Sequence, residues 1–158
     1  MLKKYKEYIY SVLIALAVSG LSALVTRNDM DLYSSINTPP LAPPSWLFPV
    51  VWTILFILMG ISSAVIYKKR KENYDLSAEG LLIYTVSLVF NFLWSVIFFK
   101  FRAFLLAFIW LFILWLLILF TILKYRRLSA FAAYLQIPYF LWVTFAAYLN
   151  LAIYLLNK

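Results

Sequence analysis

The sequence predicts an all-α integral membrane protein that folds as a bundle of five transmembrane helices. Hydrophobic residues make up 66% of the 158 residues and charged residues only 13%, whereas a soluble domain is about half apolar and about a quarter charged. The apolar residues form separate runs of about 20 residues, the length at which a helix crosses ~30 Å of hydrocarbon. The fourteen Lys and Arg residues and the six Asp and Glu residues lie outside these runs or at their ends.

The runs are expected to form the spans in chain order, and residues 1–158 are expected to form a single membrane domain. We place the spans at about residues 8–26, 46–67, 80–99, 103–123 and 129–155. None of them shows the alternation of polar and apolar residues that is typical of a membrane β-barrel. The first run follows Lys3, Lys4 and Lys6, as a signal peptide would. We interpret it as a span because it is longer than a typical signal core and lacks a convincing cleavage site.

The distribution of basic residues predicts the orientation of the bundle. With the N-terminus inside, the inner segments carry ten basic residues: Lys3, Lys4, Lys6, Lys68, Lys69, Arg70, Lys71, Lys124, Arg126 and Arg127. The outer segments carry four: Arg27, Lys100, Arg102 and Lys158. Because basic residues accumulate in cytoplasmic loops, we expect the N-terminus inside, the C-terminus outside and residues 27–44 as an outer loop. The bias suits a bacterial cytoplasmic membrane.

The net charge and the missing residue types exclude several classes of function. The charge of +8 follows from the topology, so we expect the lipid bilayer and no nucleic acid as a partner. The chain has no Cys and no His, which removes thiol catalysis, thiolate metal sites and the commonest general base. Proton pumps and ion-coupled transporters place charged groups inside the bilayer, and the predicted spans carry none. We therefore predict no metal site and no cofactor.

Prolines concentrate where the predicted outer loop meets the second span. Five of the six lie within eleven positions: Pro39, Pro40, Pro43, Pro44 and Pro49. Because proline fixes φ and has no N–H, residues 38–44 are expected to be extended and stiff. Ser45 is expected to cap the helix of the second span, with Pro49 in its first turn. The loop is either an ordered connector or a rigid lid over a cavity between helix ends.

Helical spacing places polar and aromatic residues on single faces of three spans. The faces are Ser87, Asn91, Trp94 and Ser95 in the third span, Trp52, Phe56, Gly60 and Ser63 in the second, and Pro138, Trp142, Ala146, Leu149 and Asn150 in the fifth. In the first span a stripe of small residues indicates close helix packing: Ser11, Ala15, Ser19 and Ser22.

Depth along the helices brings these faces together in the outer half of the membrane. Trp52 lies about six residues into its span, or roughly 9 Å, and Asn91 about eight residues from the outer end of its span, or roughly 12 Å. This convergence favours a pocket beneath the proline-rich loop. Packing is the alternative, because tryptophans form interfacial belts and an intramembrane Asn bonds across helices. The remaining tryptophans are expected in the belt or in lipid and packing contacts: Trp46, Trp110 and Trp115.

Three motifs resemble those of a known family. The segments APPSWLFPVVWTILF at 42–56, NFLWS at 91–95 and IPYFLWVTFAAYLN at 137–150 are similar to the second-, third- and fifth-span motifs of the translocator protein family. Its members are the tryptophan-rich sensory proteins (TspO/MBR), also called peripheral benzodiazepine receptors. The resemblance runs from about residue 33 to residue 150 with matching spacing.

The resemblance implies a five-helix bundle, commonly a homodimer, with a pocket that opens toward the first loop. It implies binding of a porphyrin such as protoporphyrin IX, and of hydrophobic drugs of the benzodiazepine and isoquinoline carboxamide types. The pocket residues that it implies are Tyr33, Pro43, Trp52, Asn91, Trp142 and Ala146. We add Trp94, which shares the face of Asn91.

Several positions depart from the family pattern. Leu32 stands where the family often has Trp, Ser87 where it has Gln, Trp110 where it has an acid and Val50 where it has Pro. The first change affects the stacking surface of the lid, and the next two remove polar groups that could tune ligand choice. The sterol motif of animal members is matched only loosely, by Leu149, Tyr154 and Lys158, so we do not predict sterol as the natural ligand.

Three functions remain open. The first is binding, transport or sensing of a flat apolar ligand, for which aromatic walls and a few polar groups are suited. The second is light-dependent porphyrin degradation with Trp52 and Trp142 as candidate catalytic residues, because few acid–base or nucleophilic groups are present. The third is a regulatory or scaffold role, in which the basic loops at 68–71 and 124–127 dock a partner or anionic lipid.

Overall fold

The computed structural model describes residues 2–29 and 31–158. Its long helices are α1 (Leu2–Thr26), α3 (Leu47–Lys69), α4 (Tyr74–Ser95), α5 (Phe104–Arg126) and α6 (Ala130–Leu156). Three short elements complete the described chain: η1 (Arg27–Asp29), α2 (Leu32–Ser35) and the π-helical turn η2 (Val96–Lys100), which continues α4. Five helices are long and apolar enough to cross a membrane. The predicted fold class is confirmed: the chain is an all-α, multi-pass integral membrane protein.

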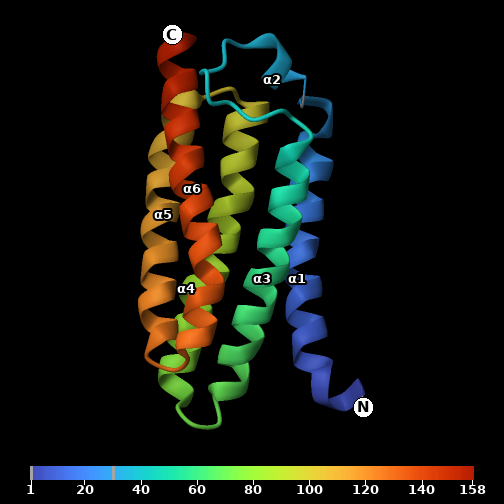
Figure 1. The fold of residues 1–158 in the computed structure, drawn as a ribbon, viewed down its shortest axis with the longest axis vertical. Helices are drawn as coiled ribbons and strands as arrows, with labels where there is room; N and C mark the ends of the chain where they lie inside the picture. The colour runs from blue at the N-terminus through green and yellow to red at the C-terminus, as the bar shows by residue number, and fades with distance from the viewer. Residues whose placement is uncertain (1, 30) are drawn as a thin grey trace.

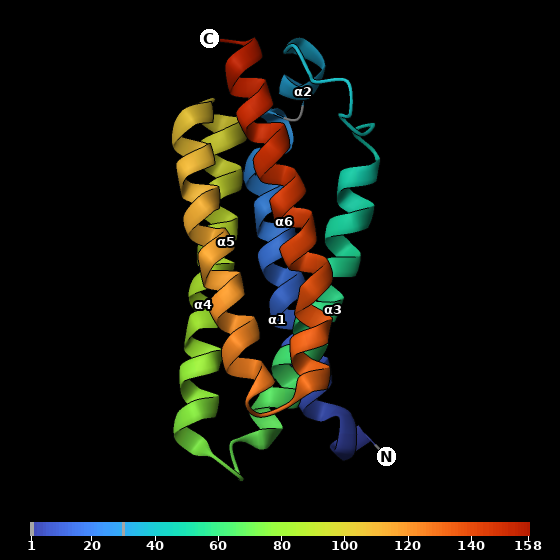
Figure 2. The same cartoon turned by 60° about the vertical axis from the view of Figure 1, so that its left-hand side comes forward.

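The long helices run alternately up and down, so that the two termini lie at opposite ends of the bundle (Figure 1). We call the end that carries α2 and the C-terminus the loop end, and the other the N-terminal end. α5 packs against α4 and α6, while α1 packs mainly against α3. α3 also contacts α6 and α4, which joins α1 and α3 to the other three long helices in one bundle (Figure 2).

The helix bounds agree with the predicted spans to within about a turn at most ends. The two larger differences are at the starts of α1 and α4, which begin at Leu2 and Tyr74 rather than near residues 8 and 80. At α4 the side-chain oxygen of Asn73 accepts a hydrogen bond from the N–H of Leu76 at 3.0 Å. Such a cap starts a helix in polar sequence, so the helix extends beyond the apolar run from which the span was predicted.

The expected cap at Ser45 is wrong. The N-cap position of α3 is Trp46, and its side chain makes no capping hydrogen bond. The chain instead enters the helix through a backbone turn in which the N–H of Leu47 donates to the carbonyl of Pro44 at 3.0 Å. Ser45 is thus held within the turn, while Pro49 lies in the first turn of α3 as expected.

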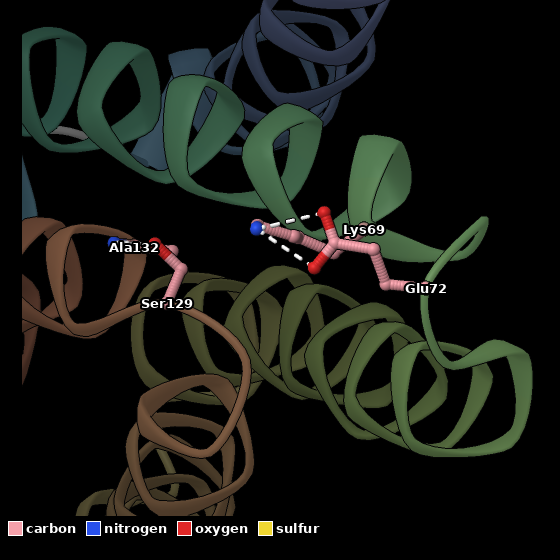
Figure 3. A network of polar contacts seen from close by, with 4 residues as sticks. All are labelled: Lys69, Glu72, Ser129 and Ala132. Carbon is pink, nitrogen blue, oxygen red and sulfur yellow. Dashed lines mark hydrogen bonds and ion pairs between the residues drawn. The ribbon is translucent and has the colours of Figure 1, made fainter.

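Polar contacts hold the turns at the N-terminal end of the bundle. The ammonium of Lys69 donates to both carboxylate oxygens of Glu72 at 2.9 Å, and the hydroxyl of Ser129 caps α6 by accepting from the N–H of Ala132 (Figure 3). Lys124 of α5 also pairs with Glu79 of α4. Because exposed ion pairs contribute at most about 1 kcal/mol, they fix the turns, while apolar packing supplies most of the stability of the bundle.

A close approach of two helices joins α1 to α3. A Cβ built on Gly60 would lie 2.5 Å from the Cα and 2.9 Å from the backbone nitrogen of Val12. Ala15, one turn further along α1, is fully buried. The first half of the small-residue stripe predicted on the first span therefore packs inward, and Gly60 is the residue of α3 that permits the contact.

We predict that Gly60→Ala destabilises the protein by about 1–3 kcal/mol, because the methyl group meets backbone atoms that cannot move independently of α1. The unfolding temperature in detergent, followed by circular dichroism, should fall by several degrees. Gly20→Ala is the matched control, since a Cβ at Gly20 meets nothing within 4 Å. Equal stability of the two variants would show that α1 and α3 are not in this contact.

Candidate ligand-binding site

A cavity of about 400 Å³ lies at the loop end of the bundle. Its walls come from the last turns of α1, the first turns of α3, the end of α4 with η2, and the last turns of α6, and Tyr33 contributes from α2. Small side chains on α1 leave the space open, among them Ser19, Gly20 and Ala23. The volume falls within the range of about 300–1,000 Å³ that is typical of small-molecule sites.

Trp52 is the centre of an aromatic cluster along one wall of this cavity. Its ring centroid lies 5.8 Å from that of Phe56 and 6.4 Å from that of Trp94. On its other side it meets Tyr139 at 6.2 Å and Trp142 at 6.5 Å, both edge to face. Trp52 is half-buried, so part of its indole remains available to a ligand. Each aromatic pair of this kind stabilises a protein by about 0.5–1.5 kcal/mol, in addition to the stabilisation that comes from burying apolar area.

Asparagine side chains connect the helices around the cavity. The amide of Asn91 donates to the hydroxyl of Tyr139 at 3.0 Å, which joins α4 to α6. The indole N–H of Trp94 donates to the Oδ1 of Asn150 at 3.1 Å, and the Nδ2 of Asn150 donates to the carbonyl of Phe104 at 2.8 Å. Among the described residues no hydrogen bond occupies the Oδ1 of Asn91. Asn91 therefore links two helices and also leaves an acceptor at the cavity wall.

Tyr33 fixes the loop over the cavity. Its hydroxyl donates to the carbonyl of Pro43 at 3.1 Å, and its ring packs edge-on against Phe48 at 5.3 Å. Burial raises the pKa of the Tyr33 hydroxyl, so the group stays protonated and remains a donor at neutral pH. Beside it Leu32, only 2% exposed, packs into the core. At this position the lid is anchored by an aliphatic side chain rather than by an indole.

The end of α6 binds the loop through a second contact. The side chain of Asn157 accepts a hydrogen bond from the N–H of Asn37 at 2.9 Å and donates one to the carbonyl of Asn37 at 2.8 Å. Its amide also reaches the carbonyl of Ile153 at 2.8 Å. A turn in which the N–H of Ala42 donates to the carbonyl of Pro39 folds the segment that was expected to be fully extended. The loop, which we call the lid, is thus held by the bond of Tyr33 to Pro43 and by the bonds of Asn37 to Asn157.

The structure brings most of the predicted site residues to one cavity. Its lining includes Tyr33, Trp52, Asn91, Trp94 and Ala146. Two predicted residues lie outside the lining: Pro43, whose carbonyl accepts from Tyr33, and Trp142, which lies edge-on to Trp52. The assignment of these seven residues to ligand binding remains a prediction.

The face predicted for the fifth span, which forms α6, differs from the observed one at Pro138. Pro138 is exposed, because Tyr139 and Val143 occupy the inward face of α6 at that level. Trp110 and Trp115 are packing residues, as expected: the indole N–H of Trp110 donates to the carbonyl of Phe90 at 2.9 Å, and that of Trp115 to the hydroxyl of Thr144 at 2.9 Å.

Sequence reasoning missed the contribution of α1. Ser22, Ala23 and Thr26 of α1 line the cavity, and so do Arg27 of η1 and Phe98 and Phe99 of η2. The stripe of small residues on the first span was interpreted as packing along its whole length. Its first half does pack, but its second half borders open space, and the Ser-rich composition of that half was the available signal.

The comparisons with known proteins agree with this architecture. A sequence model of the TspO/MBR family matches residues 11–156. The chain is 39% identical to the tryptophan-rich protein TspO of Chlorobaculum tepidum, over 79% of this chain and 78% of the relative. It is 32% identical to the protein of the same name from Archaeoglobus fulgidus, over 96% and 97%. It is 33% identical to the translocator protein of Ovis aries, over 75% and 70%.

We predict that Asn157→Ala loosens the lid, because it removes both hydrogen bonds to Asn37. Loss of two exposed bonds of this kind costs about 1–2 kcal/mol, or roughly a 5- to 30-fold increase in loop opening. Hydrogen exchange of residues 32–44, measured by mass spectrometry, should become faster by that factor. Asn28→Ala is the control, since Asn28 is exposed at the same end, and the hydrogen bonds that the backbone of Asn37 makes to side chains among the described residues go to Asn157. Unchanged exchange in Asn157→Ala would contradict the role of this contact.

Proposed function

This chain belongs to the TspO/MBR family, and from that premise we propose that it binds a flat, largely apolar ligand beneath the 27–44 loop. The leading candidate is a porphyrin such as protoporphyrin IX. The observation that carries the proposal is the aromatic cluster around Trp52, which borders a cavity of about 400 Å³. Benzodiazepine- and isoquinoline-type drugs share the flat apolar shape and are proposed for the same cavity.

The physical fit rests on two properties of the wall. Aromatic side chains offer apolar area and stacking geometry to a planar ring system. A small number of polar groups, such as the free Oδ1 of Asn91, are enough to orient such a ligand. Transport, sensing and light-dependent degradation would all begin from this bound state. Of the two tryptophans proposed for degradation, Trp52 lines the cavity and Trp142 packs against it.

The second part of the proposal concerns orientation. We propose that the N-terminus faces the cytoplasm of a bacterium and that the lid faces outward. The support is the clustering of Lys68, Lys69, Arg70 and Lys71 with Lys124, Arg126 and Arg127 in the turns that end α3 and α5, as the positive-inside rule requires.

Because the chain has no cysteine, single-cysteine variants can test the orientation cleanly. Ser34→Cys in α2 and Lys71→Cys in the α3–α4 turn are both exposed positions. In intact cells a membrane-impermeant maleimide should label Ser34→Cys directly, and should label Lys71→Cys only after the membrane is permeabilised. The reverse pattern would place the lid on the cytoplasmic side.

We predict that Trp52→Phe weakens binding of protoporphyrin IX by roughly 5- to 30-fold, corresponding to about 1–2 kcal/mol of lost contact. Trp142→Phe should have a smaller effect, because Trp142 supports Trp52 without lining the cavity. Titrations should follow the absorbance of the porphyrin, so that the readout does not depend on the tryptophan that is removed. Trp115→Phe, which lies outside the lining, should bind like the wild type. If Trp52→Phe keeps full affinity, the ligand lies elsewhere.

A further inference from the structure

A single cation lies at the mouth of the cavity. Among the described residues that line it, Arg27 is the one that carries a charge. Arg27 begins η1 directly after the last residue of α1, and its side chain is exposed. Within the described part of the chain it forms no ion pair, although Asp29 and Asp31 are close in sequence. Its guanidinium donors are therefore available to a molecule that enters the cavity.

The position of Arg27 continues the cavity face of α1. Ser19, Ala23 and Arg27 follow one another at four-residue intervals and all line the cavity, as residues on one helical face should. On the same wall the hydroxyl oxygen of Ser22 is buried and has no hydrogen-bond partner among the described residues. Two unpaired polar groups thus occur near the end of α1 that leads into the loop.

The part of the cavity that α3 and α4 line has a different chemistry. Trp52, Phe56 and Trp94 form an apolar aromatic wall, and the indole N–H of Trp94 is already bonded to Asn150. The cavity is therefore amphipathic: aromatic along α3 and α4, and cationic where α1 ends. Its complement is a flat apolar body that carries an acidic group at one edge.

We propose that Arg27 binds an acidic group of the ligand, so that among molecules with the same planar ring system the cavity favours those that carry a carboxylate. This inference rests on the proposed function, and it assigns a recognition element to the same site. A guanidinium binds a carboxylate through two parallel N–H···O bonds, an arrangement that lysine does not reproduce. In protoporphyrin IX the carboxylates of the two propionate groups are the acceptors, while the macrocycle lies against Trp52.

The test compares protoporphyrin IX with its dimethyl ester, which has the same ring system and no carboxylate. Binding of each to wild-type protein and to Arg27→Gln is measured in detergent at two salt concentrations. We expect Arg27→Gln to weaken binding of the diacid about 10-fold, with a smaller salt dependence than in the wild type. Affinity for the diester should be the same in both proteins.

Two further variants sharpen the result. Arg102→Gln makes the same substitution at an exposed position outside the lining, and it should bind both porphyrins like the wild type. Arg27→Lys keeps the charge and loses the paired geometry, so its affinity for the diacid should be intermediate. Arg27→Lys is also a control, because it tests whether weak binding by Arg27→Gln results from misfolding.

The possible outcomes separate this inference from the proposed function. If wild type and Arg27→Gln bind the diacid equally well, Arg27 does not recognise the carboxylate, although the cavity still binds porphyrin. If Arg27→Gln weakens diacid and diester equally, the role of Arg27 is not charge recognition, and the inference is again wrong. If neither porphyrin binds the wild-type protein, the proposed function fails and this inference fails with it.

Discussion

The absence of hydrogen-bonding solvent inside a bilayer is the constraint on which the rest of this structure depends. It requires each backbone polar group to be satisfied within its own helix, and it makes the few polar side chains bond between helices. Toward the N-terminal end, the hydroxyl of Ser62 donates to the carbonyl of Ala132 and accepts from the amide of Gln136. Nearer the loop end, Asn91 bonds Tyr139 and Trp94 bonds Asn150. These links fix the relative positions of α3, α4 and α6. The cavity can persist because the helices that line it are held in place.

The cavity itself results from side-chain size on α1. Near Val12 and Ala15 this helix lies against α3 so closely that only glycine fits at position 60. Toward the loop its facing side chains remain small, and a Cβ at Gly20 would meet nothing within 4 Å. The same helix therefore packs tightly against α3 near its middle and leaves space at the loop end. The lid lies at this end of the bundle, contributes Tyr33 to the lining of the cavity and is held by the hydrogen bonds of Tyr33 and Asn157.

Features that depend on the pattern of residues along the chain could be predicted from the sequence. Features that depend on which distant residue a side chain contacts could not. Hydrophobic runs located the spans, and helical spacing oriented the faces of Asn91 and Trp52 correctly. Neither signal could show that Trp142 packs against Trp52 outside the cavity lining. Periodicity indicates which face of a helix a residue lies on, but not which residue of another helix it contacts. The pairing of Asn37 with Asn157 joins residues 120 positions apart, and no local signal indicates it. Ser45 was misassigned because a proline-rich turn supplied the backbone bonds that a capping side chain would have made.

The aromatic residues of the chain fall into two groups by position. Trp46, 64% exposed, suits an interfacial belt, whereas Trp52 and Trp94 form the wall of a cavity beneath the lid. The most direct test of this division is an experimental structure of the protein with protoporphyrin IX bound. We predict density for the macrocycle beside Trp52, between Asn91 and Ala146, with the lid closed above it. Density for the porphyrin on the lipid-facing surface, with this cavity unfilled, would contradict it.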